Sequence, residues 1–106
     1  MPNREEMIVE NLSAVLAELK SQQDVGDQFP PDQKNFRDTM EDLREWVEDV
    51  NEYGLAYEVL VCMLESHPFR ISGSAAVKLL EVALLLGYKT TRDEDAMFDI
   101  RRRNPA

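Results

Sequence analysis

The order of apolar and polar positions divides the chain into segments with a helical period and short segments without one. The first periodic segment follows Asn3, a good helix N-cap, with Glu6 three residues later in the reciprocal position of a capping box. It should run to about Gln22. Its apolar residues have the spacing of one buried stripe: Ile8, Leu12, Val15, Leu16 and Leu19. The pattern predicts an amphipathic helix that faces a core, with Glu18 off the buried stripe.

The clearest helical period comes after a loop. Residues 24–31 contain Gly26 and the pair Pro30–Pro31, lack a period, and form the longest predicted loop. A second helix should begin near Pro31 or Asp32. Its apolar residues repeat at spacings of four, three, four and three: Phe36, Met40, Leu43, Val47 and Val50.

Two more apolar segments follow a break at residues 51–54. Residues 55–64 are hydrophobic at every position except Glu58, so this helix should be nearly surrounded by protein until Pro68 ends it. Ser72 can cap the next helix, and Gly87 supplies the left-handed residue that commonly closes one. Its interior, residues 75–86, has Lys78 and Glu81 as its only polar positions.

The C-terminal segment has the signature of a short helix. Thr91 and Glu94 form a second capping box, and the run Arg101–Arg103 suits a last helical turn. Its apolar residues are too few for a strong stripe, so we expect it to dock weakly or fray, with residues 101–106 as a loose basic tail.

These elements predict the fold class. No segment alternates in the way that a β-strand does. A chain of 106 residues, 43 % of them hydrophobic, is large enough for a single modest core. We therefore expect an all-α protein with one domain over residues 1–106, a compact bundle of four main helices with a short fifth C-terminal helix.

The charge balance narrows the classes of partner. A formal net charge of -9 repels phosphate backbones and anionic lipid heads, so neither nucleic acid nor membrane is an expected partner. The same charge attracts basic proteins and raises their rate of encounter. The N-terminal residues lack the pattern of a signal peptide, which makes the cytoplasm the expected location. Many ordinary cytosolic proteins are acidic too, so the net charge alone does not establish that the partner is a basic protein.

The second predicted helix has two different faces. At 100° per residue, its five apolar positions lie within about 80° of one another. Trp46 lies at one side of the opposite sector, and Arg37 and Arg44 lie at the other. That sector holds seven carboxylates, which are Asp38, Glu41, Asp42, Glu45, Glu48, Asp49 and Glu52.

Such a face has two interpretations. A charged sector on an amphipathic helix is most often a solvated surface. However, like charges three or four residues apart cost about 0.2–0.5 kcal/mol per pair, and only Arg37, Arg44 and Lys34 can offset them. Partly exposed tryptophans are also common at interface centres. The hypothesis is therefore a protein-binding site formed by Trp46 and the seven carboxylates.

The residues that most enzymes need are scarce. Cys62 is the only cysteine and lies in an apolar run, where it should be a small buried hydrophobe. His67 is the only histidine and should be a helix cap or surface residue. Carboxylates on a convex helix make a poor acid and base pair, and Ser72–Ser74 lacks the pattern of a phosphate loop. We expect no catalytic site, no cofactor and no metal.

Several short motifs resemble a known family. Residues 51–60 read Asn-Glu-Tyr-Gly-Leu-Ala-Tyr-Glu-Val-Leu, an apolar-Ser step follows at Ile71–Ser72, and a last helix with Leu79–Leu80 closes on Leu86–Tyr88. Over about residues 36–88 this pattern resembles the MafI-type family of small immunity proteins of bacterial polymorphic toxin systems. The resemblance implies a protein that binds and neutralises a cognate toxin without catalysis. It assigns no toxin-contacting side chains.

Two functions are consistent with these observations. One is an immunity protein whose acidic face covers the basic active surface of a toxin, for example a nuclease. The alternative is a helical adaptor or regulatory protein that docks, or self-associates as a homodimer, through apolar helix faces. The adaptor function is suggested by residues 55–64 and 75–86, which together contain more hydrophobic side chains than one small core buries.

Overall fold

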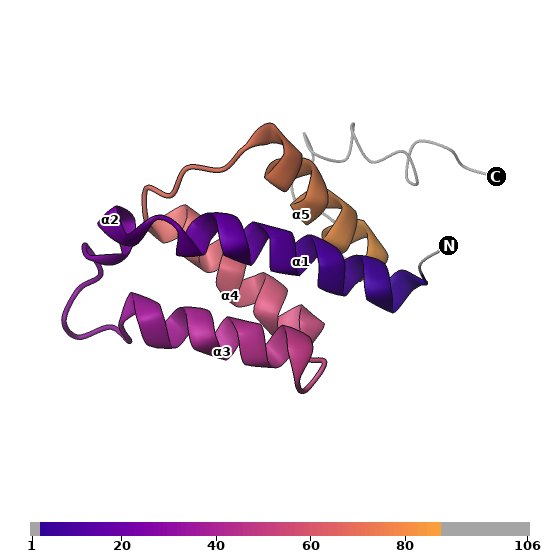
Figure 1. Ribbon diagram of the computed structural model, residues 1–106, viewed down its shortest axis with the longest axis horizontal. Coiled ribbons are helices and arrows are strands. Elements are labelled where there is room, and N and C mark those ends of the chain that lie inside the picture. Colours follow the sequence, from indigo (N-terminus) through magenta and orange to yellow (C-terminus); the bar gives the residue numbers. More distant parts are fainter. Residues whose placement is uncertain (1–2, 88–106) are drawn as a thin grey trace.

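The computed structural model describes residues 3–87, and this part of the chain is all-α (Figure 1). Its helices are α1 (Arg4–Lys20), the short α2 (Gln23–Gly26), α3 (Phe36–Glu48), α4 (Tyr53–Ser66) and α5 (Gly73–Leu85). The four main predicted helices are confirmed. The predicted fifth helix after Thr91 and the basic tail lie outside the described residues.

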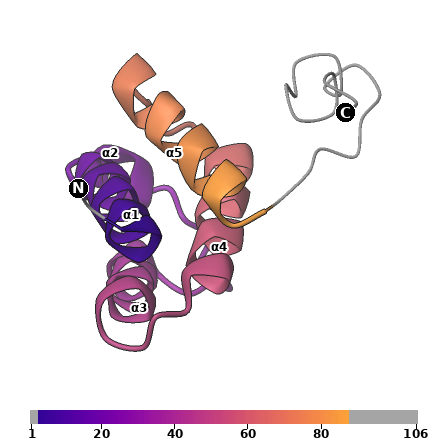
Figure 2. The ribbon, with the colours of Figure 1, turned by 90° about the vertical axis from the view of Figure 1, so that its right-hand side faces the viewer.

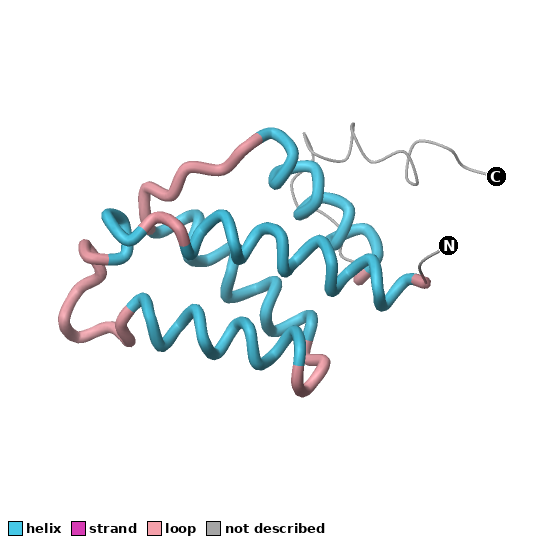
Figure 3. Tube along the Cα trace, in the orientation of Figure 1, coloured by secondary structure: helices cyan, strands magenta, loops and turns pink. Residues whose placement is uncertain are grey.

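Helix α1 is the centre of the bundle. It packs against α5 along one side and against α3 along the other, and α3 packs in turn against α4. Figure 2 shows the bundle end-on, with α5 crossing over α1 at the edge farthest from α3. Loops join the helices at both ends of the bundle (Figure 3). The core between the helices contains the predicted stripe of α1 together with side chains such as Leu43, Leu60 and Val82, all fully buried.

The N-caps decide where the first two long helices begin. The Oδ1 atom of Asn3 accepts a hydrogen bond from the backbone N–H of Glu6 at 2.8 Å, as predicted. The Oδ1 atom of Asn35 accepts from the N–H of Asp38 at 2.8 Å, so α3 begins at Phe36. The predicted start near residue 31 is therefore wrong: the proline pair forms a turn, with the N–H of Gln33 donating to the carbonyl of Pro30 at 3.0 Å, and the helix begins only after the Asn35 cap.

The end of α3 differs from the prediction as well. The helix ends at Glu48 with Asp49 as its C-cap, and Asn51 has a left-handed φ of 56° that turns the chain toward α4. Val50 therefore leaves the apolar stripe and is 50 % exposed. The break at residues 51–54 is confirmed only for its first two residues, because α4 begins at Tyr53.

The predicted loop at 24–31 contains a helical turn, α2, and a close approach of two segments. Gly26 is buried, and a Cβ atom at this position would lie 2.2 Å from Cδ2 of Phe36. Glycine is therefore required here by packing against an aromatic ring rather than by a positive φ.

Helix α4 is less enclosed than its sequence predicts. Ala56, Leu60 and Met63 are buried, but Leu55 is 42 % exposed and Glu58 and Cys62 are exposed. We predicted that protein nearly surrounds this helix and that the Cys62 thiol is buried, and both predictions are wrong. The physical reason is that α4 packs mainly on α3 and makes few contacts with α5, which leaves one side open to solvent.

Helix α5 is capped at both ends as predicted. The Oγ atom of Ser72 accepts a hydrogen bond from the N–H of Ala75 at 3.1 Å, and Gly87 has a φ of 81° beyond the last turn. The Arg4 guanidinium donates to the carbonyl of Leu85. An apolar stripe faces solvent on α5, with Val77 63 %, Leu80 61 % and Leu84 45 % exposed. We call these three residues the α5 stripe.

Two polar side chains hold the loop before α5 against α1. Gln22 is buried, donates to the carbonyl of Arg70 at 2.7 Å and accepts from its N–H at 2.8 Å. Glu18 accepts from the N–H of Ser72 at 2.5 Å and from its hydroxyl at 2.9 Å. Across residues 3–87, no helix combines the length and apolar character needed to cross a bilayer.

Candidate protein-binding surface

The predicted acidic residues form one surface on the outer side of α3, which we call the acidic face. The inner side of α3 buries Phe36, Met40, Leu43 and Val47. Asp42 and Trp46 are half-buried at one edge. The other predicted residues are exposed, namely Asp38, Glu41, Glu45, Glu48 and Asp49 on or next to α3 and Glu52 at the start of α4. Helix α3 therefore carries six of the eight residues at its surface, as its period predicts, and Asp49 is its C-cap. The predicted place of Glu52 on the same helix is wrong, because the chain turns at Asn51 and Glu52 is the N-cap of α4.

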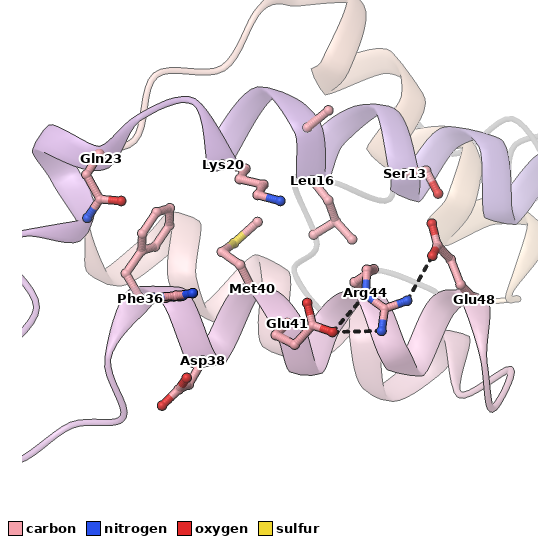
Figure 4. Close-up of a pocket in the computed structure, with 12 residues that line it drawn as sticks. Ser13, Leu16, Lys20, Gln23, Phe36, Asp38, Met40, Glu41, Arg44 and Glu48 are labelled. Carbon is pink, nitrogen blue, oxygen red and sulfur yellow. Dashed lines mark hydrogen bonds and ion pairs between the residues drawn. The ribbon is translucent and has the colours of Figure 1, made fainter.

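One guanidinium neutralises part of the acidic face. Arg44 Nη2 lies 2.7 Å from Glu41 Oε1 and 3.4 Å from Asp49 Oδ2, and Arg44 Nη1 lies 3.0 Å from Glu48 Oε2 (Figure 4). The hydrogen bond from Arg44 lowers the pKa of the Glu41 carboxyl below its ordinary value. Hydrogen bonds to Glu41 and Glu48 raise the pKa of Arg44 above its ordinary value. These three carboxylates are thus partly compensated within the protein.

A lysine from the preceding loop compensates a fourth carboxylate. The Lys34 ammonium forms an ion pair with Asp42 Oδ2. The hydrogen bond to Asp42 raises the pKa of Lys34 above its ordinary value. Both side chains remain in contact with solvent, so this pair is open to exchange with another cation.

The remaining carboxylates of the acidic face are not compensated in this way. Asp38 accepts a hydrogen bond at 3.1 Å from the side-chain amide of Asn35, which is neutral. Glu45 and Glu52 form no ion pair with any residue in the described range 3–87. Glu45 lies opposite the buried side of α3, so a negative charge stands at the centre of the face.

A groove between α1 and α3 borders the acidic face on one side (Figure 4). We call it the α1–α3 groove; it has a volume of about 820 Å³. Leu16 and Met40 lie at its floor, and the cations Lys20 and Arg37 lie along it together with the Arg44 network. Neither Lys20 nor Arg37 forms an ion pair with another described residue. Positive and negative side chains therefore both contribute to the electrostatic field on this side of the acidic face.

A second groove, between α3 and α4, borders the face on the other side and has a volume of about 560 Å³. We call it the α3–α4 groove. Asp42 and Trp46 line it from α3, whereas Glu58, Val59 and Met63 line it from α4. Glu58 is a site residue that the sequence analysis did not select. Its signal was its position as the one polar residue among residues 55–64, which we read only as an interruption of the apolar run.

The residues that most often carry catalysis, one histidine and one cysteine, both lie along the α3–α4 groove. His67 is half-buried at the C-cap of α4, with its ring stacked on Phe29 at a centroid distance of 4.0 Å and its Nε2 atom 3.3 Å from Gln33 Nε2. The Cys62 thiol is exposed and makes no hydrogen bond with a described residue. Within residues 3–87, no group of three His, Cys, Asp or Glu side chains is arranged to hold a metal ion.

The comparisons with known proteins add no relative. The chain matches no family model, no curated protein and no solved structure. The functional assignment therefore depends on the surface geometry and on the motifs of the sequence.

Proposed function

We propose that this protein is a non-catalytic immunity protein, which neutralises a bacterial toxin by covering its basic active surface with the acidic face of α3. The observation that carries the proposal is the uncompensated charge on that face. Glu45 and Glu52 are exposed and form no ion pair with a described residue, and Trp46 lies half-buried at the edge.

Within an isolated helix, acidic residues three and four positions apart repel one another, and the repulsion is relieved when a cationic surface covers them. Arg44 already relieves it for Glu41, Glu48 and Asp49. The other carboxylates remain available to an external cation, and a basic toxin surface supplies several at once.

The immunity role, as distinct from binding, comes from the resemblance to MafI-type proteins in residues 51–60, 71–72 and 79–88. An acidic cover is sufficient to inhibit an enzyme that needs a cationic groove for its substrate, as a nuclease does. Inhibition by occlusion requires no catalytic group on the immunity protein.

The test begins with the neighbouring gene. If that gene encodes a large secreted protein with a toxic C-terminal domain, co-expression of the present protein should restore growth to cells that produce the toxic domain. The double variant Glu45→Lys, Glu52→Lys should slow association with that domain at least about tenfold and flatten its dependence on salt.

The control has the same change in charge at another place. Glu10 on α1 and Glu65 on α4 are both exposed and lie outside the acidic face. Glu10→Lys combined with Glu65→Lys should slow association much less. Equal association rates for the two double variants would overturn the acidic face as the binding site, and failure to protect cells would overturn the immunity role.

A specific observation favours the adaptor as the second candidate. The α5 stripe places three large apolar side chains at spacings of three and four residues in solvent. This exposure agrees with the hydrophobic excess expected from the sequence. Light scattering over a concentration series tests self-association: a mass that rises with concentration in the native chain and not in Leu80→Lys supports this candidate, and a constant monomer mass removes the homodimer.

A further inference from the structure

We propose that the α3–α4 groove is the pocket for one arginine side chain of the partner, which enters between Trp46 and Glu58 and takes the place of Lys34 at Asp42. This inference rests on the proposed function, because it names the anchor by which a basic partner is held. It also predicts where the binding energy is concentrated on a surface that is otherwise broadly acidic.

The walls of the groove match the parts of an arginine. Val59, which is half-buried on α4, provides apolar surface on which a three-carbon stem can lie, and the buried Met63 lies beneath it. Asp42 on α3 and Glu58 on α4 provide carboxylates on the two opposite walls. A planar guanidinium has donors in a fixed fork and can serve both carboxylates, whereas an ammonium is a single point charge.

Trp46 provides an aromatic surface in the same groove. It is half-buried against the core, and its indole N–H makes no hydrogen bond within the described part of the chain. Its ring packs on the core and lines the groove, and tryptophan is the side chain over which cations bind best. Arginine stacks on such rings more often than lysine does.

Only one of the two carboxylates in the α3–α4 groove has a cationic partner within the described part of the protein. The Lys34 ammonium forms an ion pair with Asp42, which demonstrates that a basic side chain can reach this wall. The carboxylate of Glu58, by contrast, has neither an ion pair nor a hydrogen bond with any residue between 3 and 87. The loop lysine therefore pairs with Asp42 alone, whereas an incoming arginine can pair with both Asp42 and Glu58.

The chain contains two reporters for a direct test. Trp46 is its only tryptophan and Cys62, which also lines the groove, is its only cysteine. A blocked peptide, acetyl-Gly-Gly-Arg-Gly-Gly-amide, should quench Trp46 fluorescence in a saturable way and slow the reaction of Cys62 with a thiol reagent. The same peptide with citrulline, which has the shape of arginine without its charge, should do neither.

Matched variants distinguish binding in the α3–α4 groove from attraction of the peptide by the net negative charge of the protein. Asp42→Asn and Glu58→Gln should each weaken binding of the arginine peptide about threefold or more, whereas Glu65→Gln on the same helix as Glu58 should not. Lys34→Met should strengthen binding about threefold, whereas Lys20→Met, with the same change in charge in the α1–α3 groove, should have a smaller effect. Trp46→Leu should weaken binding as measured by protection of Cys62.

The outcomes distinguish this inference from the proposed function. Equal binding of the arginine and citrulline peptides, or equal effects of Lys34→Met and Lys20→Met, would overturn the pocket while leaving the acidic face intact. Arginine-specific binding that depends on Glu58 would support the pocket even if the double variant at Glu45 and Glu52 associated normally with a toxin domain. In that case it is the acidic-face model that fails.

Discussion

Glu18 on α1 and Ser72 before α5 are joined by two hydrogen bonds, which link two helices. Both carboxylate oxygens of Glu18 accept hydrogen bonds from Ser72, one from its backbone N–H at 2.5 Å and one from its hydroxyl at 2.9 Å. The same hydroxyl accepts from the N–H of Ala75 and caps α5. The link joins the end of the central helix to the start of the helix that crosses over it.

Removing either side of this link should destabilise the protein. Ser72→Ala should lower the free energy of unfolding by about 1 kcal/mol, as the loss of an N-cap does. Glu18→Gln should lower it by about 1–2 kcal/mol, because the charge-assisted acceptors are weakened. Urea denaturation measures both changes. Additive effects in the double variant would contradict the link, since residues in one hydrogen-bond network are expected to couple.

Gly26 should tolerate no side chain. A Cβ atom there would lie 2.2 Å from Cδ2 and 2.4 Å from Cγ of Phe36, a buried ring that has little room to move. Gly26→Ala should therefore lower the free energy of unfolding by about 1–3 kcal/mol. Gly73→Ala is the matched control, because no atom lies within 4 Å of its Cβ position in the first turn of α5. A neutral or stabilising Gly26→Ala would contradict the packing of α2 on α3.

Tyr53 should make stability sensitive to alkaline pH. Its hydroxyl donates to Glu5 at 2.8 Å, and burial and this hydrogen bond raise its pKa to about 12 from an ordinary value of about 10. A pKa raised by folding adds stability that is complete below the unfolded value and is lost as the pH rises through the folded value. The native chain should therefore lose stability between about pH 10 and pH 12 more steeply than Tyr53→Phe.

Urea denaturation at several alkaline pH values measures this difference. Because the lysines titrate in the same range in both chains, only the difference between native chain and Tyr53→Phe is diagnostic. Parallel curves for the two chains would show that the Tyr53 hydroxyl is not linked to Glu5 in solution.

Arg44 should stabilise the protein slightly and weaken the binding of external cations to the acidic face. Arg44→Gln removes the cation shared by Glu41, Glu48 and Asp49 and should bring a small loss of stability that grows at low salt. It should also tighten the binding of a hexa-arginine peptide about two- to threefold, because three carboxylates are released. Arg37→Gln makes the same change in charge at a residue without an ion pair among those described, and its loss of stability should be smaller.

The sequence predicted the candidate site well where the site depends on one helix. The part of the acidic face between Asp38 and Glu48, and the position of Trp46 at its edge, follow from the 3.6-residue period of α3. The period does not place Glu52, which lies beyond the turn at Asn51. The ion pairs of Arg44 with Glu41 and Glu48 follow from spacings of three and four residues, whereas Asp49, five residues away, comes within reach at the C-cap of the helix. The α3–α4 groove could not be predicted, because Glu58 meets Asp42 and Trp46 only after α4 has packed against α3.

The sequence by itself determined the four main helices, the N-caps of α1 and α5 and most of the buried sides of α1 and α3, because these depend on local hydrogen bonds and on the period of apolar residues within one segment. The tertiary structure alone decided the exposure of the apolar helices. Leu55 and Cys62 lie in a run that was predicted to be buried, yet they face solvent because α5 packs on α1 and makes few contacts with α4. The period of α5 does not say which of its apolar residues, such as Leu80, the core leaves exposed. Only the packing of helices distant in the chain distinguishes an apolar residue in the core from one at a surface.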